Sequence, residues 1–221
     1  MTCTRFFFGN FSLAAIVPET AKDRAVNADD QRLIQECLKG RSEAFGELVS
    51  RYQNRLFNTV FRLLDHAEDA RDVVQEAFLS AYQALGSFKG DSQFFTWLYR
   101  IAVNSAISFK RKHRATRRLG LAGEDSGTVE PHDSSAVSQP DRVLQLADEE
   151  RRIQAALCRL SPEHRAVLVM KDIDGMKYED MAEVLDVPIG TVRSRLHRAR
   201  MDLRDIWLEL HPETEERSTR K

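Results

Sequence analysis

The sequence predicts an all-α protein made of two small helical domains that are joined by a flexible linker. Apolar residues keep helical spacing from Ala28 to about Leu85 and again from Gln93 to about Arg114, with no sustained alternation of the β type. Residues 119–140 are rich in Gly, Pro, Ser and acids and poor in apolar residues, which is typical of a tether. Helical spacing returns from Asp141. We therefore expect domains at 28–118 and 141–210, a linker at 119–140 and a polar tail at 211–221.

Helix boundaries in the first domain are marked by breakers and caps. Ser42 is a plausible N-cap of a second helix, and the segment 65–69 breaks that helix and leads into a third, Ala67 to Leu85. A loop follows at 86–90. Asp91 or Ser92 is expected to cap the next, long helix.

The second domain ends in two short amphipathic helices at a turn. Ser161 and Pro162 give an N-cap and a first-turn proline for the preceding helix, which Gly175 ends; Asp172 and Asp174 there are expected to be loop residues. In the pair, Met181, Ala182 and Leu185 should face inward and Val187 should seal the turn, with Pro188 starting the last helix. Asp186 stands in the turn, where Asp tolerates the left-handed conformation. Lys177 leaves the first helix of the pair without a side-chain cap.

The last helix has one apolar face and one basic face. Its apolar residues recur at helical spacing (Val192, Leu196, Ala199 and Leu203), and rotation by 100° per residue puts a polar set on the opposite side, namely Arg193, Ser194, His197 and Arg198. A helix anchored by one face and presenting Arg, Ser and His on the other suits the major groove of DNA. Nucleic acid is therefore the first partner to consider.

Charge is segregated along the chain, although the net charge is only −1. Residues 109–118 carry six Lys or Arg and no acid, whereas residues 65–76 carry five carboxylates and one Arg. Two partner surfaces of opposite sign would explain this pattern, and two solvated helix faces would explain it equally well.

The cysteines indicate a reducing compartment. Cys3, Cys37 and Cys158 are odd in number and far apart, so neither a disulfide framework nor a zinc site follows. Cys37 and Cys158 occupy apolar helical positions and are expected in the core. The chain is expected to be cytoplasmic.

The N-terminal segment 1–27 contains an apolar run that superficially resembles a signal peptide. The run is too short to span a bilayer and is interrupted by Gly9, Asn10 and Ser12. We expect a disordered extension or a misplaced start codon, and no membrane insertion.

Four segments, taken in order, resemble the extracytoplasmic-function (group IV) sigma factors of the sigma-70 family. They are DVVQEAF (72–78), FKGDS (88–92), TWLYRIAVN (96–104) and GTVRSRLHRAR (190–200). The resemblance implies a sigma-2 domain at 28–118 and a sigma-4 helix-turn-helix domain at 141–210. It also implies an alternative sigma factor that binds core RNA polymerase, recognises the −10 and −35 promoter elements and initiates transcription, in a stress or envelope response. An anti-sigma factor is an expected second partner.

The resemblance assigns roles to particular residues. An acidic helix face, made of Asp72, Gln75 and Glu76, would bind core polymerase. The parts of polymerase that contact the protein would be the β′ clamp helices and the β subunit. The −10 element would be bound by Phe88 and Asn104, in a pocket for a flipped base, and by basic neighbours, which are Lys89, Arg100, Lys110, Arg111 and Lys112. The −35 element would be bound by Lys171, Thr191, Arg193, Ser194, Arg195, His197, Arg198 and Arg200. Trp97 is expected to anchor the core rather than to stack on a base.

Two other classes of protein compete with this interpretation. A free-standing helix-turn-helix regulator would leave segments 72–78 and 88–104 unexplained, and an enzyme with a DNA-binding tail would need a catalytic cluster. The histidines are scattered and no nucleophile or phosphate-loop motif occurs, so we expect no catalytic residue, no cofactor and no metal.

Overall fold

The computed structural model describes residues 21–118 and 140–212, and within these ranges it is helical, with no strand. The first half contains α1 (Ala21–Leu38), α2 (Glu43–Leu64), α3 (Ala67–Ala84), a 3₁₀ turn η1 (Leu85–Ser87) and α4 (Phe94–Arg118). The second half contains α5 (Pro140–Arg159), α6 (Pro162–Leu168), a π-helical turn η2 (Val169–Ile173), α7 (Tyr178–Leu185) and α8 (Ile189–Leu210). The predicted all-α class is confirmed.

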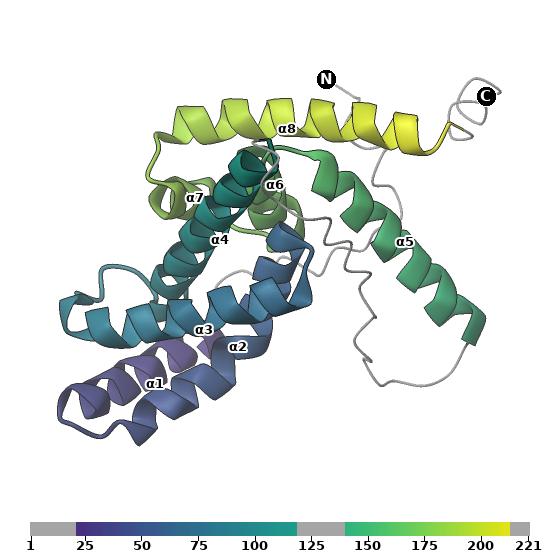
Figure 1. Ribbon diagram of the computed structural model, residues 1–221. Coiled ribbons are helices and arrows are strands. Elements are labelled where there is room, and N and C mark those ends of the chain that lie inside the picture. The colour runs from purple at the N-terminus through teal and green to yellow at the C-terminus, as the bar shows by residue number, and fades with distance from the viewer. Residues whose placement is uncertain (1–20, 119–139, 213–221) are drawn as a thin grey trace.

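The first half is a bundle in which α2 packs against α1, α3 and α4 (Figure 1). Helix α2 buries one stripe of side chains at helical spacing, which includes Leu48, Leu56 and Val60. Helix α3 buries Val73, Val74, Ala77 and Phe78 on one side, as its sequence predicts. The opposite side of α3 is thereby left to solvent.

Three local features of the first half differ from the predictions. Helix α1 already begins at Ala21, inside the segment 1–27 that we expected to precede the domain, because no Gly or Pro interrupts residues 21–28. Ser42 precedes α2 but has helical dihedral angles and makes no side-chain capping bond. Helix α4 begins at Phe94 and continues to Arg118, so the basic run is helical. The remainder of segment 1–27, residues 119–139 of the predicted linker and most of the tail lie outside the described residues.

The helices and turns of the second half begin and end close to the residues that the sequence predicts. The Ser161 side chain accepts a hydrogen bond from the backbone N–H of His164 (3.2 Å), with Pro162 in the first turn of α6. Gly175 has φ +69°, the left-handed conformation that glycine tolerates best. Asp186 takes the same conformation (φ +52°) in the turn between α7 and α8 and ends α7, as expected. Pro188 lies one residue before α8 rather than inside it, because its ψ of +146° is extended.

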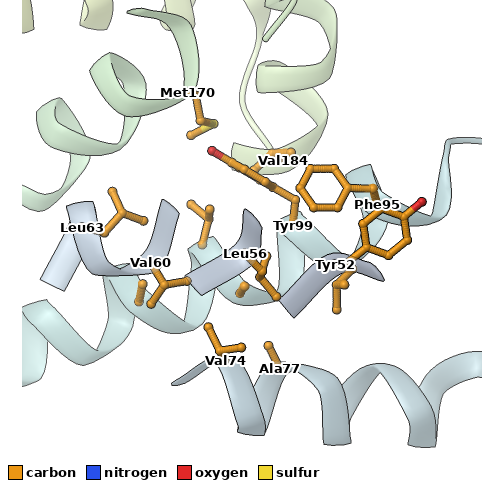
Figure 2. Packing of buried hydrophobic residues seen from close by; sticks show 14 of the residues in the cluster. Tyr52, Leu56, Val60, Leu63, Val74, Ala77, Phe95, Tyr99, Met170 and Val184 are labelled. Atoms are coloured by element: carbon orange, nitrogen blue, oxygen red, sulfur yellow. The ribbon is translucent and has the colours of Figure 1, made fainter. Parts of the chain in front are cut away.

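The two halves pack against each other, which the sequence did not predict. Helix α4 lies against α7 and α6, and α2 contacts α5, α6 and η2 (Figure 1). Their apolar residues form one continuous cluster. Figure 2 shows Met170 and Val184 of the second half beside Tyr99 and Phe95 of α4. The described parts of the chain therefore adopt a closed arrangement, which we call the closed packing.

Candidate polymerase and nucleic-acid interfaces

Helix α8 is anchored by one face and presents a basic face to solvent. Val192 and Ala199 are fully buried and Leu196 is 2% exposed. The predicted outward set, Arg193, Ser194, His197 and Arg198, is exposed. The predicted orientation of this helix is therefore confirmed. We call these four residues the basic face.

Other residues of the predicted −35 set hold α8 in place. Arg200 binds Asp172 of η2 through two hydrogen bonds, Nε to Oδ2 (3.1 Å) and Nη2 to Oδ1 (2.5 Å). The Lys171 ammonium donates to the Met176 carbonyl (2.9 Å) and lies 4.7 Å from the ring centre of Tyr178. Arg200 and Lys171 thus have partners inside the protein and brace the helix-turn-helix, while Thr191 and Arg195 are half-buried.

Helix α3 exposes the predicted acidic face. Asp72, Gln75 and Glu76 are exposed, while the next apolar positions along the helix face the core. The face continues with two exposed apolar side chains, Leu79 (56% exposed) and Tyr82. They recur at helical spacing after Asp72 and Gln75, a signal in the sequence that we overlooked. The whole face combines carboxylates with an apolar strip.

The loop before α4 leads into an aromatic cluster. The Phe88 ring lies 5.9 Å from Phe94 and 5.2 Å from Trp97, measured between ring centres. Phe88 and Trp97 are half-buried and pack against the core, which agrees with the anchoring role expected for Trp97. Lys89 is exposed beside this cluster, and Gly90 has φ +77°.

Several −10 candidates on α4 contact other parts of the protein. The Asn104 amide donates to the Val184 carbonyl of α7 (3.1 Å). The Arg111 guanidinium binds Glu163 of α6 (2.7 Å from Nε to Oε1). The Lys110 ammonium donates to the Leu64 carbonyl at the end of α2 (2.5 Å), and burial lowers the pKa of Lys110. Arg100 is half-buried and Lys112 is exposed.

Two charged residues that were not assigned a site from the sequence lie between the halves. Asp174, expected to be a loop residue, accepts hydrogen bonds from Thr59 of α2 (2.9 Å) and Tyr99 of α4 (2.7 Å). Burial raises the pKa of this carboxyl. Arg165 is only 1% exposed; it donates to the carbonyls of Leu63 and Leu157, both at 2.6 Å. The contacts of Asp174 with Thr59 and Tyr99, and of Arg165 with Leu63, join residues far apart in sequence, so no local pattern reveals them.

Cys158, near Arg165, is half-buried, and burial raises its pKa to about 12. Cys37 is half-buried and packs against the core. In the described ranges, no group of three His, Cys, Asp or Glu residues could hold a metal ion, and no helix is long and apolar enough to cross a membrane.

Comparison with known families accounts for both halves of the chain. The model of sigma-70 region 2 matches residues 48–116, and that of sigma-70 region 4 matches residues 150–203. The chain is 38% identical over 173 residues to the RNA polymerase sigma-H factor of Pseudomonas aeruginosa, covering 77% of this chain and 90% of that protein. It is 42% identical over 176 residues to the ECF RNA polymerase sigma-E factor of Escherichia coli K12, with the same coverage.

The chain belongs to the extracytoplasmic-function sigma factors of the sigma-70 family. As a sigma factor, it binds core RNA polymerase, recognises promoter −35 and −10 elements and initiates transcription. The region 2 match accounts for segments 72–78 and 88–104, which a free-standing regulator left unexplained.

Solved sigma-factor structures share the fold. The structure of CnrH in complex with the cytosolic domain of CnrY is 29% identical and has a TM-score of 0.57; the match covers 80% of this chain and 96% of CnrH. The sigma factor RpoE of Bartonella quintana, solved with the anti-sigma factor NepR, is 24% identical and has a TM-score of 0.58. That match covers 73% of this chain and 95% of the other.

Proposed function

We propose that the sigma factor binds polymerase and the two promoter elements through three separate surfaces. The acidic face of α3 (Asp72, Gln75 and Glu76) binds the β′ clamp helices of core polymerase. Phe88, Lys89, Asn104 and the basic residues of α4 bind the −10 element and hold its melted strand. The basic face of α8 binds the −35 element. The protein acts by binding and carries out no reaction of its own.

One observation supports this division most directly: the exposed faces of α3 and α8 have opposite charge. The carboxylates of α3 suit a basic partner helix, through charge-assisted hydrogen bonds. The arginines and His197 of α8 suit the phosphates and base edges of DNA. Leu79 and Tyr82 add an apolar strip to the acidic face, which we include in the polymerase-binding surface.

The roles of Lys171 and Arg200 within the −35 set are indirect in this proposal. Because both have partners inside the protein, they orient α8. Thr191 and Arg195 lie half-buried near the start of α8 and contact phosphate at the edge of the interface.

Run-off transcription with purified core polymerase tests the proposal. We expect Arg198→Ala to weaken recognition of the −35 element by about 5- to 150-fold, since one good base contact gives about 1–3 kcal/mol of discrimination. Arg204→Ala is the matched control, because it removes the same charge from an exposed position further along α8. We expect Asn104→Ala to impair strand opening and to spare −35 binding, with exposed Ser108→Ala of α4 as its control.

The outcomes separate the alternatives clearly. If the protein binds promoter duplex tightly alone and adds nothing to core polymerase, the proposal fails. Equal loss of −35 recognition and strand opening from Arg198→Ala and Asn104→Ala would contradict the division of labour. Loss of polymerase binding in Glu76→Lys, but not in Glu47→Lys on α2, would support the role of the acidic face.

An anti-sigma factor is a further proposed partner, in the cytoplasm and in a stress or envelope response. The support is the structure of CnrH, which was solved with the cytosolic domain of CnrY and is 29% identical to this chain. Co-purification of the tagged chain from its own cells, with and without envelope stress, tests this partner.

A further inference from the structure

The two arginines of the basic face differ in what surrounds them. The guanidinium carbon of Arg193 lies 5.6 Å from the ring centre of Tyr178, which is the first residue of α7. The face of a tyrosine ring attracts a cation within about 6 Å, because the ring quadrupole is negative there. In the parts of the chain that the structure describes, neither an aromatic ring nor a carboxylate holds Arg198 in this way. Arg193 is therefore oriented by a neighbour and Arg198 is not.

The Tyr178 ring has a defined position of its own. It is half-buried and packs against the core. The Lys171 ammonium of η2 lies 4.7 Å from the ring centre, and it also donates a hydrogen bond to the Met176 carbonyl (2.9 Å). Core packing and a tethered cation thus both act on the ring. Its place beside α8 does not depend on Arg193.

The backbone that carries Arg193 is fixed as well. Its neighbour Val192 is fully buried, and Arg200 on the same helix binds Asp172 of η2 through two hydrogen bonds. The ring and the guanidinium therefore meet between two helices, α7 and α8, that pack against each other. Little movement of the backbone can separate them.

A ring orients an arginine without using its hydrogen-bond donors. Arg200 illustrates the opposite case, since its Nε and Nη2 donate to the Asp172 carboxylate. Within the described residues, no carboxylate binds Arg193. A guanidinium that is attracted to a ring face keeps its N–H groups for other acceptors. Arg193 is thus both oriented and ready to donate to a base edge or a phosphate.

Such an orientation favours binding because an exposed arginine side chain loses many rotamers when it takes up one contact. A contact that already restricts these rotamers reduces the loss on binding. A cation beside an exposed aromatic ring shifts an equilibrium by about 2- to 5-fold. The expected effect on affinity is of this size and acts through Arg193.

We propose that Tyr178 is a positioning residue of the −35 interface, whose ring orients the Arg193 guanidinium toward DNA and leaves its donors for a base edge or a phosphate. The inference rests on the proposed binding of the −35 element by the basic face. Tyr178 acts through Arg193 and needs no DNA contact of its own.

The test measures −35 recognition by the holoenzyme, as the ratio of its affinities for a promoter duplex and for the same duplex with a scrambled −35 element. Tyr178→Leu removes the ring and should lower recognition by about 2- to 5-fold. Tyr178→Phe, which keeps the ring, should restore wild-type recognition. Pentafluorophenylalanine at position 178 keeps the shape of the ring but makes its face electron-poor, so it should fail to restore recognition.

Double variants assign the effect to Arg193. Tyr178→Leu should cause no further loss when it is added to Arg193→Ala, because the side chain that the ring orients is then absent. Added to Arg198→Ala, it should cause its full loss of about 2- to 5-fold, because independent effects multiply. A general distortion of α7 and α8 would instead add its loss to both arginine variants.

Four results would overturn the proposal. They are unchanged recognition in Tyr178→Leu, a full further loss in the Arg193→Ala background, failure of Tyr178→Phe to restore recognition, and equal recognition with phenylalanine and pentafluorophenylalanine. Urea unfolding establishes that the variants are folded. If Tyr178→Leu is not, the comparison of the two rings decides, since both preserve the packing. If the basic face does not bind the −35 element, Arg193→Ala and Arg198→Ala also leave recognition unchanged, so a failure of the proposed function is distinguishable.

Discussion

Leu196 and His197 are neighbours on α8 that face opposite ways, so alanine at each position should separate stability from DNA binding. Leu196 is 2% exposed and lies in the continuous core, between Val192 and Ala199 on the buried face. Truncation of a buried leucine to alanine costs about 2.7–5 kcal/mol, from lost transfer free energy and from the cavity left behind. That is a large part of the about 5–15 kcal/mol by which proteins of this kind are stable. His197 is exposed, so its truncation should change the free energy of unfolding by less than about 0.5 kcal/mol.

Urea unfolding followed by circular dichroism measures the free energies, and promoter binding by the assembled holoenzyme measures recognition of the −35 element. We expect Leu196→Ala to shift the unfolding midpoint strongly and His197→Ala to leave it unchanged. His197→Ala should instead reduce −35 recognition by about 5-fold or more, as expected for one lost base or phosphate contact. A cost below about 1 kcal/mol for Leu196→Ala, or an equal loss of stability in both variants, would refute the assignment of the two faces.

Three further predictions concern the backbone, an ion pair with one buried carboxylate, and the Asp174 carboxyl between the halves. Asp186→Gly should raise the free energy of unfolding by up to about 1 kcal/mol, since glycine adopts φ +52° without a side-chain clash; a loss in urea unfolding would contradict this. Arg51→Leu should cost about 3 kcal/mol, because Asp30 is 2% exposed and its carboxylate accepts a hydrogen bond from Arg51 (2.5 Å). Arg32→Leu, which removes exposed ion pairs with Asp29 and Glu36, should cost less than about 1 kcal/mol in the same measurement. Burial raises the pKa of Asp174 although Arg55 and Arg62 of α2 favour its charged form, so the closed packing should tighten as pH falls towards that raised pKa and loosen as pH rises through it. Energy transfer between one fluorophore at an exposed position of α1 and one near the end of α8 should show this dependence in the wild-type protein and lose it in Asp174→Asn. Persistence of the dependence in the variant would assign it to another group.

Features that depend on neighbours in sequence were predicted well. The inward and outward faces of α3 and α8 follow from helical periodicity, because burial of one stripe decides which residues point outward. The Ser161 cap and the left-handed Asp186 follow from local backbone chemistry. Local signals also have limits. Ser42 is a residue type that caps helices, yet its helical dihedral angles prevent the capping geometry.

Features that depend on contacts between the halves were not predicted. The π-helical turn η2 places Met170 toward the first half and ends directly before Asp174. Asp174 pairs with Thr59 across 115 positions, and Arg165 reaches the Leu63 carbonyl across 102. An acid near a glycine is typical of a solvated loop, and nothing in its immediate neighbours distinguishes this one. The helical periodicity of apolar residues identifies the buried face of a helix, but it does not identify the element against which that face packs.

The closed packing uses side chains that the proposed function also uses. Two of its cross-domain donors belong to the proposed −10 set: the Asn104 amide and the Arg111 guanidinium. In the closed packing they donate to backbone carbonyls or to Glu163, which are acceptors of the same kind as base edges and phosphates. Binding of the −10 element therefore exchanges one set of acceptors for another at these two donors. The hydroxyls of Thr59 and Tyr99, which donate to Asp174, are different: they lie on neither proposed DNA surface, so DNA supplies no acceptor in place of Asp174.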